Sequence, residues 1–263
     1  MLAAGPYEAV ARELAGTPFA SIAYVEETQS TNADAAALLA DENYGGHTIV
    51  AEYQSRGAGR KGRVWLAPAG TALLFTTILP RAIDTEKLWA VPFWVALAVR
   101  RALLDFGVVT ALQWPNDVLL RDRKLAGILC QSCVVASTAR VACGVGINVL
   151  RPGADLGIDP PPAFCDDVAP VQRAALLQAV LREYERSLFM LDQPERIAAA
   201  WDEAADLPGR PYRIALDGEA EPFEAVARGL ANGGGLRVVR ENGAQETVSL
   251  ADARVLRPST GSG

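Results

Sequence analysis

The chain has 263 residues, of which 50% are hydrophobic and 21% charged, and its formal net charge is -6. This length predicts one large domain or a large and a small one, and the composition excludes a disordered or collagen-like chain. The negative charge argues against a general nucleic-acid coat, and the single histidine, His47, excludes a multi-histidine metal site.

Hydrophobic periodicity and turn residues predict alternating helices and strands up to about residue 205. Helices are expected at 6–15, 31–40, 84–106 with a kink or a break at Pro92, 170–190 and 194–205. Strands are expected at 21–27, 47–53, 71–79, 111–114, 118–121, 125–136 and 140–149. We interpret His47, at the start of a strand, as structural.

The composition shifts near Leu207-Pro208-Gly209, and short β-like runs follow at 212–216, 223–230, 236–240 and 246–250. Asp217-Gly218, Asn232-Gly233 and Asn242-Gly243 are the turn signals between them. We therefore predict two domains, residues 1–207 and 208–263, the second a small all-β module that ends in a flexible tail at 259–263.

Neither a signal peptide nor a membrane span is expected. The first ten residues lack a positive region and an apolar run, and Pro92 interrupts the longest apolar stretch, 88–99. That stretch is also shorter than the roughly 20 residues that a bilayer requires. We expect a cytoplasmic protein without a membrane partner.

The four cysteines include a C-x-x-C pair, Cys130 and Cys133, a pattern that can indicate zinc or redox chemistry. The surrounding segment has the pattern of a strand, in which residues three apart point to opposite faces, so these thiols cannot chelate one ion. Cys143 and Cys165 form no second pair of that type. We therefore expect structural thiols and no zinc.

The segment Gly57-Ala-Gly59-Arg-Lys-Gly62 fits G-x-G-x-x-G, but it is followed by a predicted strand, whereas a dinucleotide fingerprint must open a helix. It is not a Walker A motif, because no Gly-Lys-Ser/Thr follows. Its glycines let backbone N–H groups approach an anion, and Arg56, Arg60, Lys61 and Arg63 add positive charge. The segment predicts either an anion-binding loop or a solvated, flexible one.

Two later segments, 114–129 and 143–149, carry polar groups in apolar surroundings. In Trp114-Pro-Asn-Asp117, Pro115 fixes a turn, and the Asp117 carboxylate could hold Mg²⁺ beside a nucleotide phosphate. Lys124 begins an apolar strand and either reaches solvent or points into a cleft. In Gly144-Val-Gly-Ile-Asn148, glycines inside a strand predict close approach of a ligand or another backbone.

In this order, the segments resemble the biotin–protein ligases, the biotin–[acetyl-CoA-carboxylase] ligase family. The resemblance covers about residues 20–258 and implies an α/β (α+β) fold. A mixed-sheet catalytic domain of the biotin/lipoate ligase type would precede a small SH3-like β-barrel. The motifs that carry it are Ser30-Thr31-Asn32, Gly57–Arg63 with Trp65, Trp114-Pro-Asn-Asp117, Lys124-x-Ala-Gly127-Ile-Leu and Gly144-x-Gly-Ile-Asn148.

The resemblance implies a ligase that uses ATP and Mg²⁺ to convert biotin to biotinyl-5′-AMP and pyrophosphate. Biotin would then pass to one lysine of a biotin carboxyl carrier protein, a subunit of acetyl-CoA carboxylase. The implied biotin contacts are Ser30, Thr31, Asn32, Gln54, Gly57, Ala58, Gly59, Arg60, Trp65, Lys124 and Gly127. The implied ATP or adenylate contacts are Arg60, Arg63, Asn116, Asp117, Lys124 and Asn148, with Lys124, Arg60 and Arg63 catalytic and Asp117 a Mg²⁺ ligand.

The sequence departs from the family pattern at two positions. Ala58 stands where the loop usually has arginine, and Gln113 stands where lysine commonly precedes Trp-Pro-Asn-Asp. These departures concern anion recognition more than reaction type. Two rival interpretations are a lipoate or octanoate ligase of the same fold and a non-catalytic biotin-binding module, although the Trp-Pro-Asn-Asp and Gly-x-Gly-Ile-Asn segments favour biotin.

Many members of the family begin with a helix-turn-helix domain that represses the biotin operon. About twenty residues precede the first predicted catalytic strand here, enough for one helix, whereas a helix-turn-helix needs two. We therefore expect a ligase-only form without a nucleic-acid partner. Family members also pair through the edge of the central sheet, so a homodimer is a second expectation.

Overall fold

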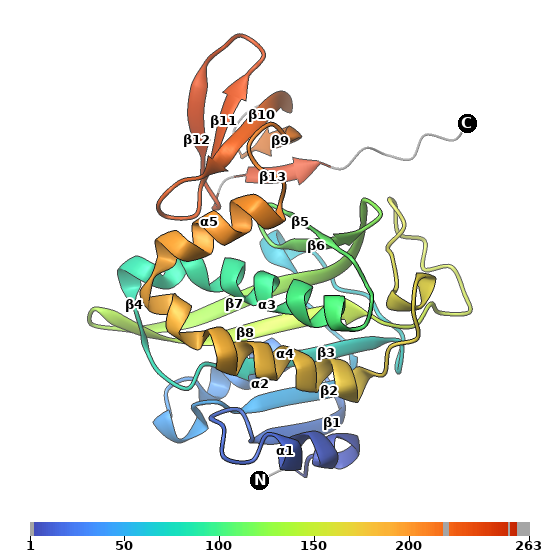
Figure 1. The fold of residues 1–263 in the computed structure, drawn as a ribbon. Coiled ribbons are helices and arrows are strands. Elements are labelled where there is room, and N and C mark those ends of the chain that lie inside the picture. The colour runs from blue at the N-terminus through green and yellow to red at the C-terminus, as the bar shows by residue number, and fades with distance from the viewer. Residues whose placement is uncertain (1–2, 218–220, 252, 257–263) are drawn as a thin grey trace.

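The computed structural model describes residues 3–217, 221–251 and 253–256, and one large mixed sheet dominates it (Figure 1). The sheet order is β1-β2-β3-β8-β7-β6-β5, with β4 paired to β8. β1 and β2 run parallel, and the other neighbours are antiparallel, which confirms the predicted mixed sheet. Its strands are β1 (Ile22–Thr28), β2 (Thr48–Gln54), β3 (Ala72–Ile78), β4 (Ile83–Asp84), β5 (Ala111–Gln113), β6 (Asp117–Leu120), β7 (Arg123–Val135) and β8 (Thr138–Asn148).

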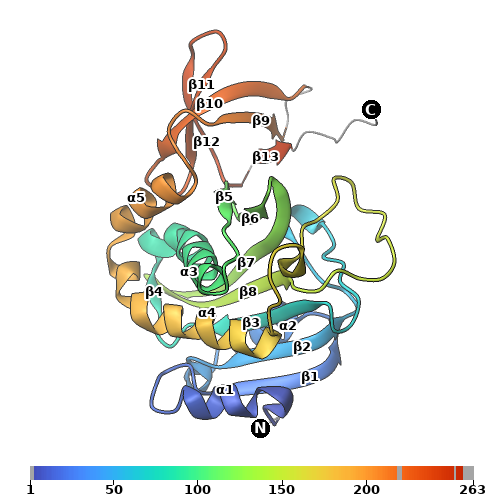
Figure 2. The ribbon, with the colours of Figure 1, turned by 45° about the vertical axis from the view of Figure 1, so that its right-hand side comes forward.

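Helices cover both faces of this sheet (Figures 1 and 2). Helices α3 (Val91–Asp105) and α4 (Arg173–Ser187) pack on one face, and α2 (Thr31–Leu38) packs on the other. Side chains alternate along a strand, so Cys143 of β8 joins the core under α3 and α4, while its neighbour Ala142 packs with Ala35 of α2. Because β3 is covered from both sides, all seven of its residues are buried.

The helix predicted over 84–106 is divided in the structure. Residues 83–84 form β4, a 3₁₀ turn η4 (Thr85–Ala90) follows, and α3 begins at Val91. Pro92 therefore lies in the first turn of α3, where its missing N–H would have no partner anyway. Of the two predicted alternatives, a kink or a break, the structure has the break, one residue before Pro92. The remaining helical segments are η1 (Gly5–Tyr7), α1 (Glu8–Glu13), η2 (Glu42–Tyr44), η3 (Arg60–Gly62), η5 (Cys165–Asp167), η6 (Leu188–Asp192) and α5 (Pro194–Ala204).

A second, antiparallel sheet of five strands follows the composition shift at residue 207. Its order is β12-β11-β10-β9-β13, and its strands are β9 (Pro211–Leu216), β10 (Phe223–Leu230), β11 (Leu236–Arg240), β12 (Gln245–Val248) and β13 (Ala253–Leu256). The turns predicted at Asn232-Gly233 and Asn242-Gly243 are present, and both glycines have positive φ. Gly218 and the predicted tail at 259–263 lie outside the described residues.

The sequence analysis did not predict β13, which pairs with β9. Several hydrogen bonds among the described residues tie the second sheet to the rest of the chain. Trp114 Nε1 donates to Gly234 O at 3.0 Å, and Arg210 Nη1 donates to Leu112 O at 2.9 Å. Asp202 of α5 accepts a hydrogen bond from Leu230 N at 2.8 Å. The two sheets are therefore joined by specific hydrogen bonds.

All four cysteines are free thiols, and Cys130 and Cys133 lie on strand β7 as predicted. Burial raises the pKa of Cys165 to about 12 and the pKa of Cys143 well above its usual value. These two thiols are therefore protonated at neutral pH, as expected for structural cysteines.

His47 is buried away from the large pocket described below. Its Nδ1 lies 2.7 Å from Ser21 Oγ, and its ring contacts the edge of Tyr44. Burial lowers the pKa of His47, so it is neutral at pH 7. Within the described residues, no helix is long and apolar enough to cross a membrane.

Candidate active site

A pocket of about 570 Å³ opens on the α2 face of the large sheet, within the size range of small-molecule sites. Segments far apart in the sequence line it: the N-terminus of α2, the loop 58–66, strands β7 and β8, and the segment 158–162. The second sheet contributes Arg213, Val255 and Leu256. One continuous cavity therefore joins nearly every motif that the sequence analysis identified.

One end of the pocket is formed by the first turn of α2. Ser30 is the N-cap of this helix, but its side chain makes no capping hydrogen bond. Gln54 of β2 takes that role instead, because its Oε1 accepts from Thr31 N at 2.8 Å and from Thr31 Oγ1 at 3.1 Å. The Ser30 hydroxyl and the Gln54 amide NH₂ group thus remain available to a ligand.

Asn32 and the buried Thr76 complete this end. Asn32 Nδ2 donates to Leu129 O on β7 at 3.0 Å, and Thr76 Oγ1 lies 2.7 Å from Asn32 Oδ1 and 2.8 Å from Thr31 Oγ1. Sequence analysis missed Thr76, although adjacent threonines at 76 and 77 inside an apolar strand are a signal of buried hydroxyl groups. We call Ser30, Thr31, Asn32 and Gln54 the head end of the pocket.

Three glycines on β7 and β8 lack a Cβ atom, and this leaves room for the side chains of Asn32, Trp65 and Lys124 to lie against the sheet. A Cβ atom at Gly144 would come within 2.0 Å of Asn32 Oδ1, and one at Gly146 within 2.7 Å of the Trp65 ring. A Cβ at Gly127 would lie 3.1 Å from both Trp65 and Lys124. The predicted close approach to the strand glycines is therefore made by side chains.

The loop 57–66 crosses the pocket as a short antiparallel turn. Gly59 N donates to Arg63 O at 2.7 Å, Trp65 N donates to Gly57 O at 2.8 Å, and Ala58 bridges Val64. Val64 and Leu66, on either side of Trp65, are 66% and 54% exposed. The loop therefore offers apolar side chains at the pocket mouth in addition to its cations.

The cations of this loop reach toward the second sheet. Arg60 Nη2 donates to Leu250 O, and Lys61 Nζ forms an ion pair with Asp217 at 2.6 Å. Burial lowers the pKa of Arg60 and nearby Arg63 lowers it further, while Asp117 opposes the shift. Arginine remains protonated despite this lowering, so Arg60 keeps its positive charge at the pocket.

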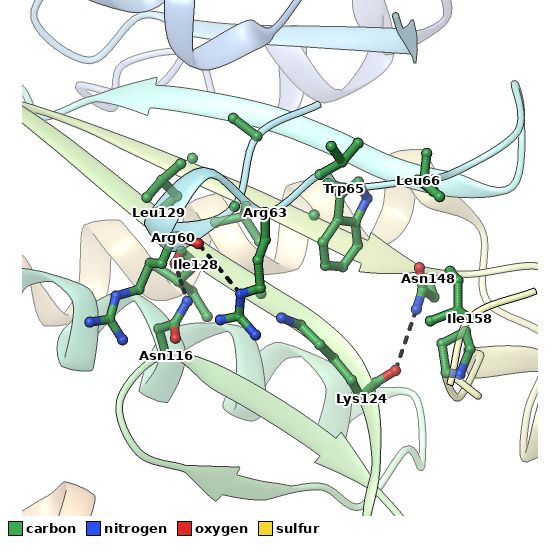
Figure 3. A pocket seen from close by; sticks show the side chains of 18 of the residues that line it. Arg60, Arg63, Trp65, Leu66, Asn116, Lys124, Ile128, Leu129, Asn148 and Ile158 are labelled. Atoms are coloured by element: carbon green, nitrogen blue, oxygen red, sulfur yellow. Dashed lines mark hydrogen bonds between the residues drawn. The ribbon is translucent and has the colours of Figure 1, made fainter. Parts of the chain in front are cut away.

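Lys124 of β7 is a cation that lines the cavity. Its Nζ lies 2.7 Å from Asp117 Oδ1 and 5.5 Å from the centre of a Trp65 ring. Its side chain is 21% exposed, against 10% for Asp117. Figure 3 shows Lys124 and Arg63 pointing toward one another below Trp65. We call Arg60, Arg63 and Lys124 the cationic end of the pocket.

The residues present do not fit a protein-held magnesium ion. The Asp117 carboxylate is engaged by Lys124, and the described residues contain no group of three His, Cys, Asp or Glu side chains placed to hold a metal. Magnesium bound mainly by substrate phosphates needs only one or two carboxylates. The metal role of Asp117 stays a prediction.

Two asparagines from the predicted motifs have their amide nitrogens engaged by the main chain (Figure 3). Asn116 Nδ2 donates to Ile128 O at 2.8 Å, and Asn148 Nδ2 lies 3.2 Å from Ala163 O and 3.4 Å from Lys124 O. Asn148 therefore connects the start of β7 to the segment that follows β8. In both residues the amide oxygen remains for a ligand.

The segment after β8 forms the outer wall of the pocket, and ion pairs hold it in place; we call these ion pairs the brace. Arg123 of β7 pairs with Asp167 at 3.0 Å and donates to Pro162 O at 3.3 Å, and Arg151 also pairs with Asp167. Sequence analysis missed this brace because its members lie up to 44 residues apart. The brace holds the wall residues Ile158, Asp159, Pro160 and Pro162 beside Asn148.

Most of the predicted site residues lie on the pocket surface. Gly57 and Asp117 do not, since Gly57 lies at the base of the loop and Asp117 lies behind Lys124. The lining residues outside the predicted set are Val64, Leu66, Ile128, Leu129, Gly144, Val145, Gly146, Ile158, Asp159, Pro160, Pro162, Arg213, Val255 and Leu256.

Comparisons with known proteins agree with this geometry. A profile of the Biotin/lipoate A/B protein ligase family matches residues 23–148. The biotin–[acetyl-CoA-carboxylase] ligase of Mycobacterium tuberculosis is 32% identical over 254 residues, which is 92% of each chain. The bifunctional ligase/repressor BirA of Escherichia coli is 27% identical over 73% of this chain and 61% of its own length.

The fold also matches solved structures. The biotin protein ligase of Aquifex aeolicus in complex with biotin and ATP superposes with a TM-score of 0.72 over 90% of this chain and 99% of that chain. The sequence identity is 21%, so this likeness concerns the fold.

Proposed function

The chain belongs to the Biotin/lipoate A/B protein ligase family and is a ligase, and from that premise we propose that it attaches biotin to protein in two steps. Biotin and ATP first form biotinyl-5′-AMP and pyrophosphate. Biotin then passes to one lysine of a biotin carboxyl carrier protein. One observation carries the proposal: a single pocket joins a neutral, hydrogen-bonding head end to a cationic end. Biotin has a neutral ring system and a carboxylate tail, so it matches both ends.

Hydrogen-bond directions at the head end support a cyclic urea as its ligand. Gln54 Oε1 already accepts two hydrogen bonds from Thr31, so its NH₂ group is left as a donor for a carbonyl oxygen. The Ser30 hydroxyl, which caps nothing, can accept from a urea N–H. We assign biotin contacts to Ser30, Thr31, Asn32, Gln54, Gly57, Ala58, Gly59, Arg60, Trp65, Lys124 and Gly127.

The cationic end suits the adenylation step, in which two anions must meet. A biotin carboxylate oxygen attacks the α-phosphorus of ATP, the bond to pyrophosphate breaks, and pyrophosphate leaves with the electron pair. Arg60, Arg63 and Lys124 offset the repulsion between the anions and stabilise the departing charge. Without these cations the carboxylate and the triphosphate would repel each other.

The nucleotide side of the pocket is assigned to Asn116, Asp117 and Asn148 together with the cations. The free amide oxygens of the two asparagines suit the exocyclic amine of adenine or a ribose hydroxyl. Magnesium that arrived with ATP would supply additional charge neutralisation, and Asp117 is the residue predicted to hold it.

The second step needs no covalent enzyme intermediate. The neutral carrier lysine attacks the acyl carbon of the mixed anhydride, AMP leaves with the electron pair, and the amine loses a proton to solvent. Lys124 stabilises the oxyanion that forms during this attack.

The loop 55–63 is the lid of this site in our proposal. Biotinyl-5′-AMP is hydrolysable, so water must be excluded while it waits for the carrier. Glycines at 57, 59 and 62 permit the loop to rearrange, and its exposed Val64 and Leu66 flank are available to cover a ligand.

We extend the proposal to domains and partners. Residues 1–207 form the catalytic domain, and residues 208–263 form a second domain whose five antiparallel strands support an SH3-like barrel. The carrier is the biotin carboxyl carrier subunit of acetyl-CoA carboxylase. We propose a cytoplasmic enzyme without a repressor role or nucleic-acid partner, and a homodimer formed through the sheet edge.

Pyrophosphate release from ATP tests the first step. The purified chain is incubated with biotin, with lipoate or with neither, and release that depends on biotin is expected. Release with lipoate alone would assign the chain to the lipoate-activating branch. Absence of release with either acid would contradict the ligase reaction and would indicate that Ala58 and Gln113 disable the site. A mass increase of the carrier domain with biotin and ATP tests the second step.

A further inference from the structure

Thr76 carries a buried hydroxyl group in β3, an interior strand of the large sheet. Its exposed fraction is 0%, and it does not line the pocket. A hydroxyl group buried in an apolar strand is costly unless it is hydrogen-bonded. Both neighbours of Thr76 Oγ1, Thr31 Oγ1 at 2.8 Å and Asn32 Oδ1 at 2.7 Å, belong to residues of the head end.

Hydrogen bonds at Thr76 act together with main-chain hydrogen bonds to orient Thr31, Asn32 and Gln54 of the head end. The single hydroxyl hydrogen of Thr76 lies within reach of two acceptor oxygens, Asn32 Oδ1 and Thr31 Oγ1, and Thr31 Oγ1 in turn donates to Gln54 Oε1 at 3.1 Å. Because Gln54 Oε1 also accepts from Thr31 N, the Gln54 NH₂ group is directed to the ligand. Asn32 cannot reverse its amide group, because Oδ1 accepts from Thr76 and Nδ2 donates to Leu129 O.

We propose that Thr76 is a positioning residue that sets the specificity of the head end without touching substrate. It fixes which atoms of Thr31, Asn32 and Gln54 donate and which accept. The head end then binds a ring that carries a carbonyl next to an N–H group and rejects a ring without polar groups, such as the dithiolane of lipoate. This inference rests on the proposed function, since it refines how the same pocket selects its acid.

Thr77 provides a matched control on the same strand. It is also 0% exposed, and its hydroxyl group pairs with Thr48 Oγ1 at 2.9 Å. Because side chains alternate along a strand, Thr77 lies on the opposite face from Thr76 and away from the head end. Thr77→Val removes an equivalent buried hydroxyl group but leaves the head end unchanged.

The test compares Thr76→Val, Thr76→Ser and Thr77→Val in pyrophosphate release and in calorimetric titration with biotin. For Thr76→Val we expect the KM and Kd for biotin to rise by about 10- to 100-fold, as for a buried hydrogen-bond partner left unsatisfied. The KM for ATP should stay within about 2-fold, and the preference for biotin over lipoate should fall in parallel. Thr76→Ser should restore biotin affinity to within about 3-fold, and Thr77→Val should leave it unchanged. If Thr76→Val does not fold, Thr76→Cys keeps the volume with a weaker donor and carries the same expectation.

The outcomes separate this inference from the proposed function. Unchanged biotin affinity and unchanged preference in Thr76→Val, with a wild-type chain that releases pyrophosphate with biotin, would overturn the role of Thr76 alone. Equal losses in Thr76→Val and Thr77→Val would overturn it as well, because they would indicate a general packing effect. A wild-type chain that neither binds biotin nor releases pyrophosphate would overturn both.

Discussion

The two ends of the pocket are built from different chemistry. At the head end, the buried side chains of Thr31 and Asn32 are hydrogen-bonded to the half-buried Gln54 of β2 or to the buried Thr76 of β3. At the cationic end, Arg60, Arg63 and Lys124 project from a loop and a strand end and are partly exposed. The head end is therefore preorganised, whereas the cationic end has partners that an arriving anion can replace.

Because of this difference, we expect the head end to select the ligand and the cationic end to promote the reaction. The neutral groups of the head end are already held in place by hydrogen bonds to one another. A ligand that leaves their remaining donors and acceptors without hydrogen bonds binds weakly, and this discrimination requires no conformational change. Cations that receive and release anions must exchange partners in each cycle, so contacts such as Lys124 with Asp117 and Arg60 with Leu250 O hold them between turnovers. Loss of a head-end group should therefore change KM for biotin, and loss of a cation should change kcat.

The largest expected effect is at Lys124. Lys124→Ala should lower kcat for pyrophosphate release by about 100- to 1000-fold, the usual consequence of removing one preorganised donor from a transition state. Steady-state kinetics with biotin and ATP measure this loss, and circular dichroism checks that the variant folds. Lys87→Ala is the control, because Lys87 pairs with Asp84 outside the pocket. Near-normal turnover in Lys124→Ala would remove Lys124 from the mechanism.

A glycine substitution at the head end should raise KM for biotin and leave kcat almost unchanged, the reverse of the effect expected for Lys124→Ala. In Gly144→Ala the new Cβ would lie 2.0 Å from Asn32 Oδ1, so Asn32 must move. We expect KM for biotin to rise on the order of 10- to 100-fold while kcat at saturation changes little, since the lost interactions are buried hydrogen bonds. Gly153→Ala, at a position with no atom within 4 Å of the added Cβ, should be neutral. A kcat loss without a KM change would contradict the division between the ends.

The proposed lid, residues 55–63, carries two cations of the cationic end, and its mobility can be measured by proteolysis. Trypsin cuts after Arg56, Arg60, Lys61 and Arg63, which all lie in or beside the proposed lid. Biotin together with ATP should slow cleavage of this segment by about 10-fold or more, because biotinyl-5′-AMP orders it. Equal cleavage rates with and without ligands would show that the segment is not a lid.

The charged brace behind the outer wall should respond to pH. Burial alone would raise the pKa of Asp167, but hydrogen bonds from Arg151 and Phe164 N and the charges of Arg151 and Arg123 outweigh it and lower the pKa. A lowered carboxyl pKa stabilises the fold above the unfolded value of about 3.9 and loses that contribution as pH falls through the folded value. Thermal unfolding should show Asp167→Asn less stable at pH 7, with the gap shrinking below about pH 4.

The smallest effect is expected at Lys61. Its ion pair with Asp217, whose side chain is 53% exposed, should contribute roughly 0–1 kcal/mol to stability. Lys61→Ala should therefore change kcat and the melting temperature only slightly. A loss as large as that of Lys124→Ala would show that the loop depends on its contact with the second sheet, and the cationic end would have to include Lys61.

Sequence patterns predicted those parts of the fold and site that depend on local residues. Strand alternation, turn glycines and the composition shift at 207 gave the sheets, and the motifs around Thr31, Lys124 and Asn148 gave most of the pocket lining. The sequence could not decide between a kink and a break at Pro92, because a proline in the first helical turn and one inside a helix give the same local signal. Thr76 and the Arg123–Asp167 pair were missed, because their partners lie 44 or 45 residues away and only the tertiary fold brings them together.

Titration with biotin and with its primary-alcohol analogue, in the absence of ATP, tests the division between the two ends most directly. Wild type and Lys124→Ala are compared by calorimetry. If the head end selects the ring and Lys124 acts on the carboxylate, both chains should bind the alcohol with the same Kd, and Lys124→Ala should bind biotin more weakly than wild type. A Lys124→Ala chain that loses affinity for the alcohol as strongly as for biotin would contradict the account.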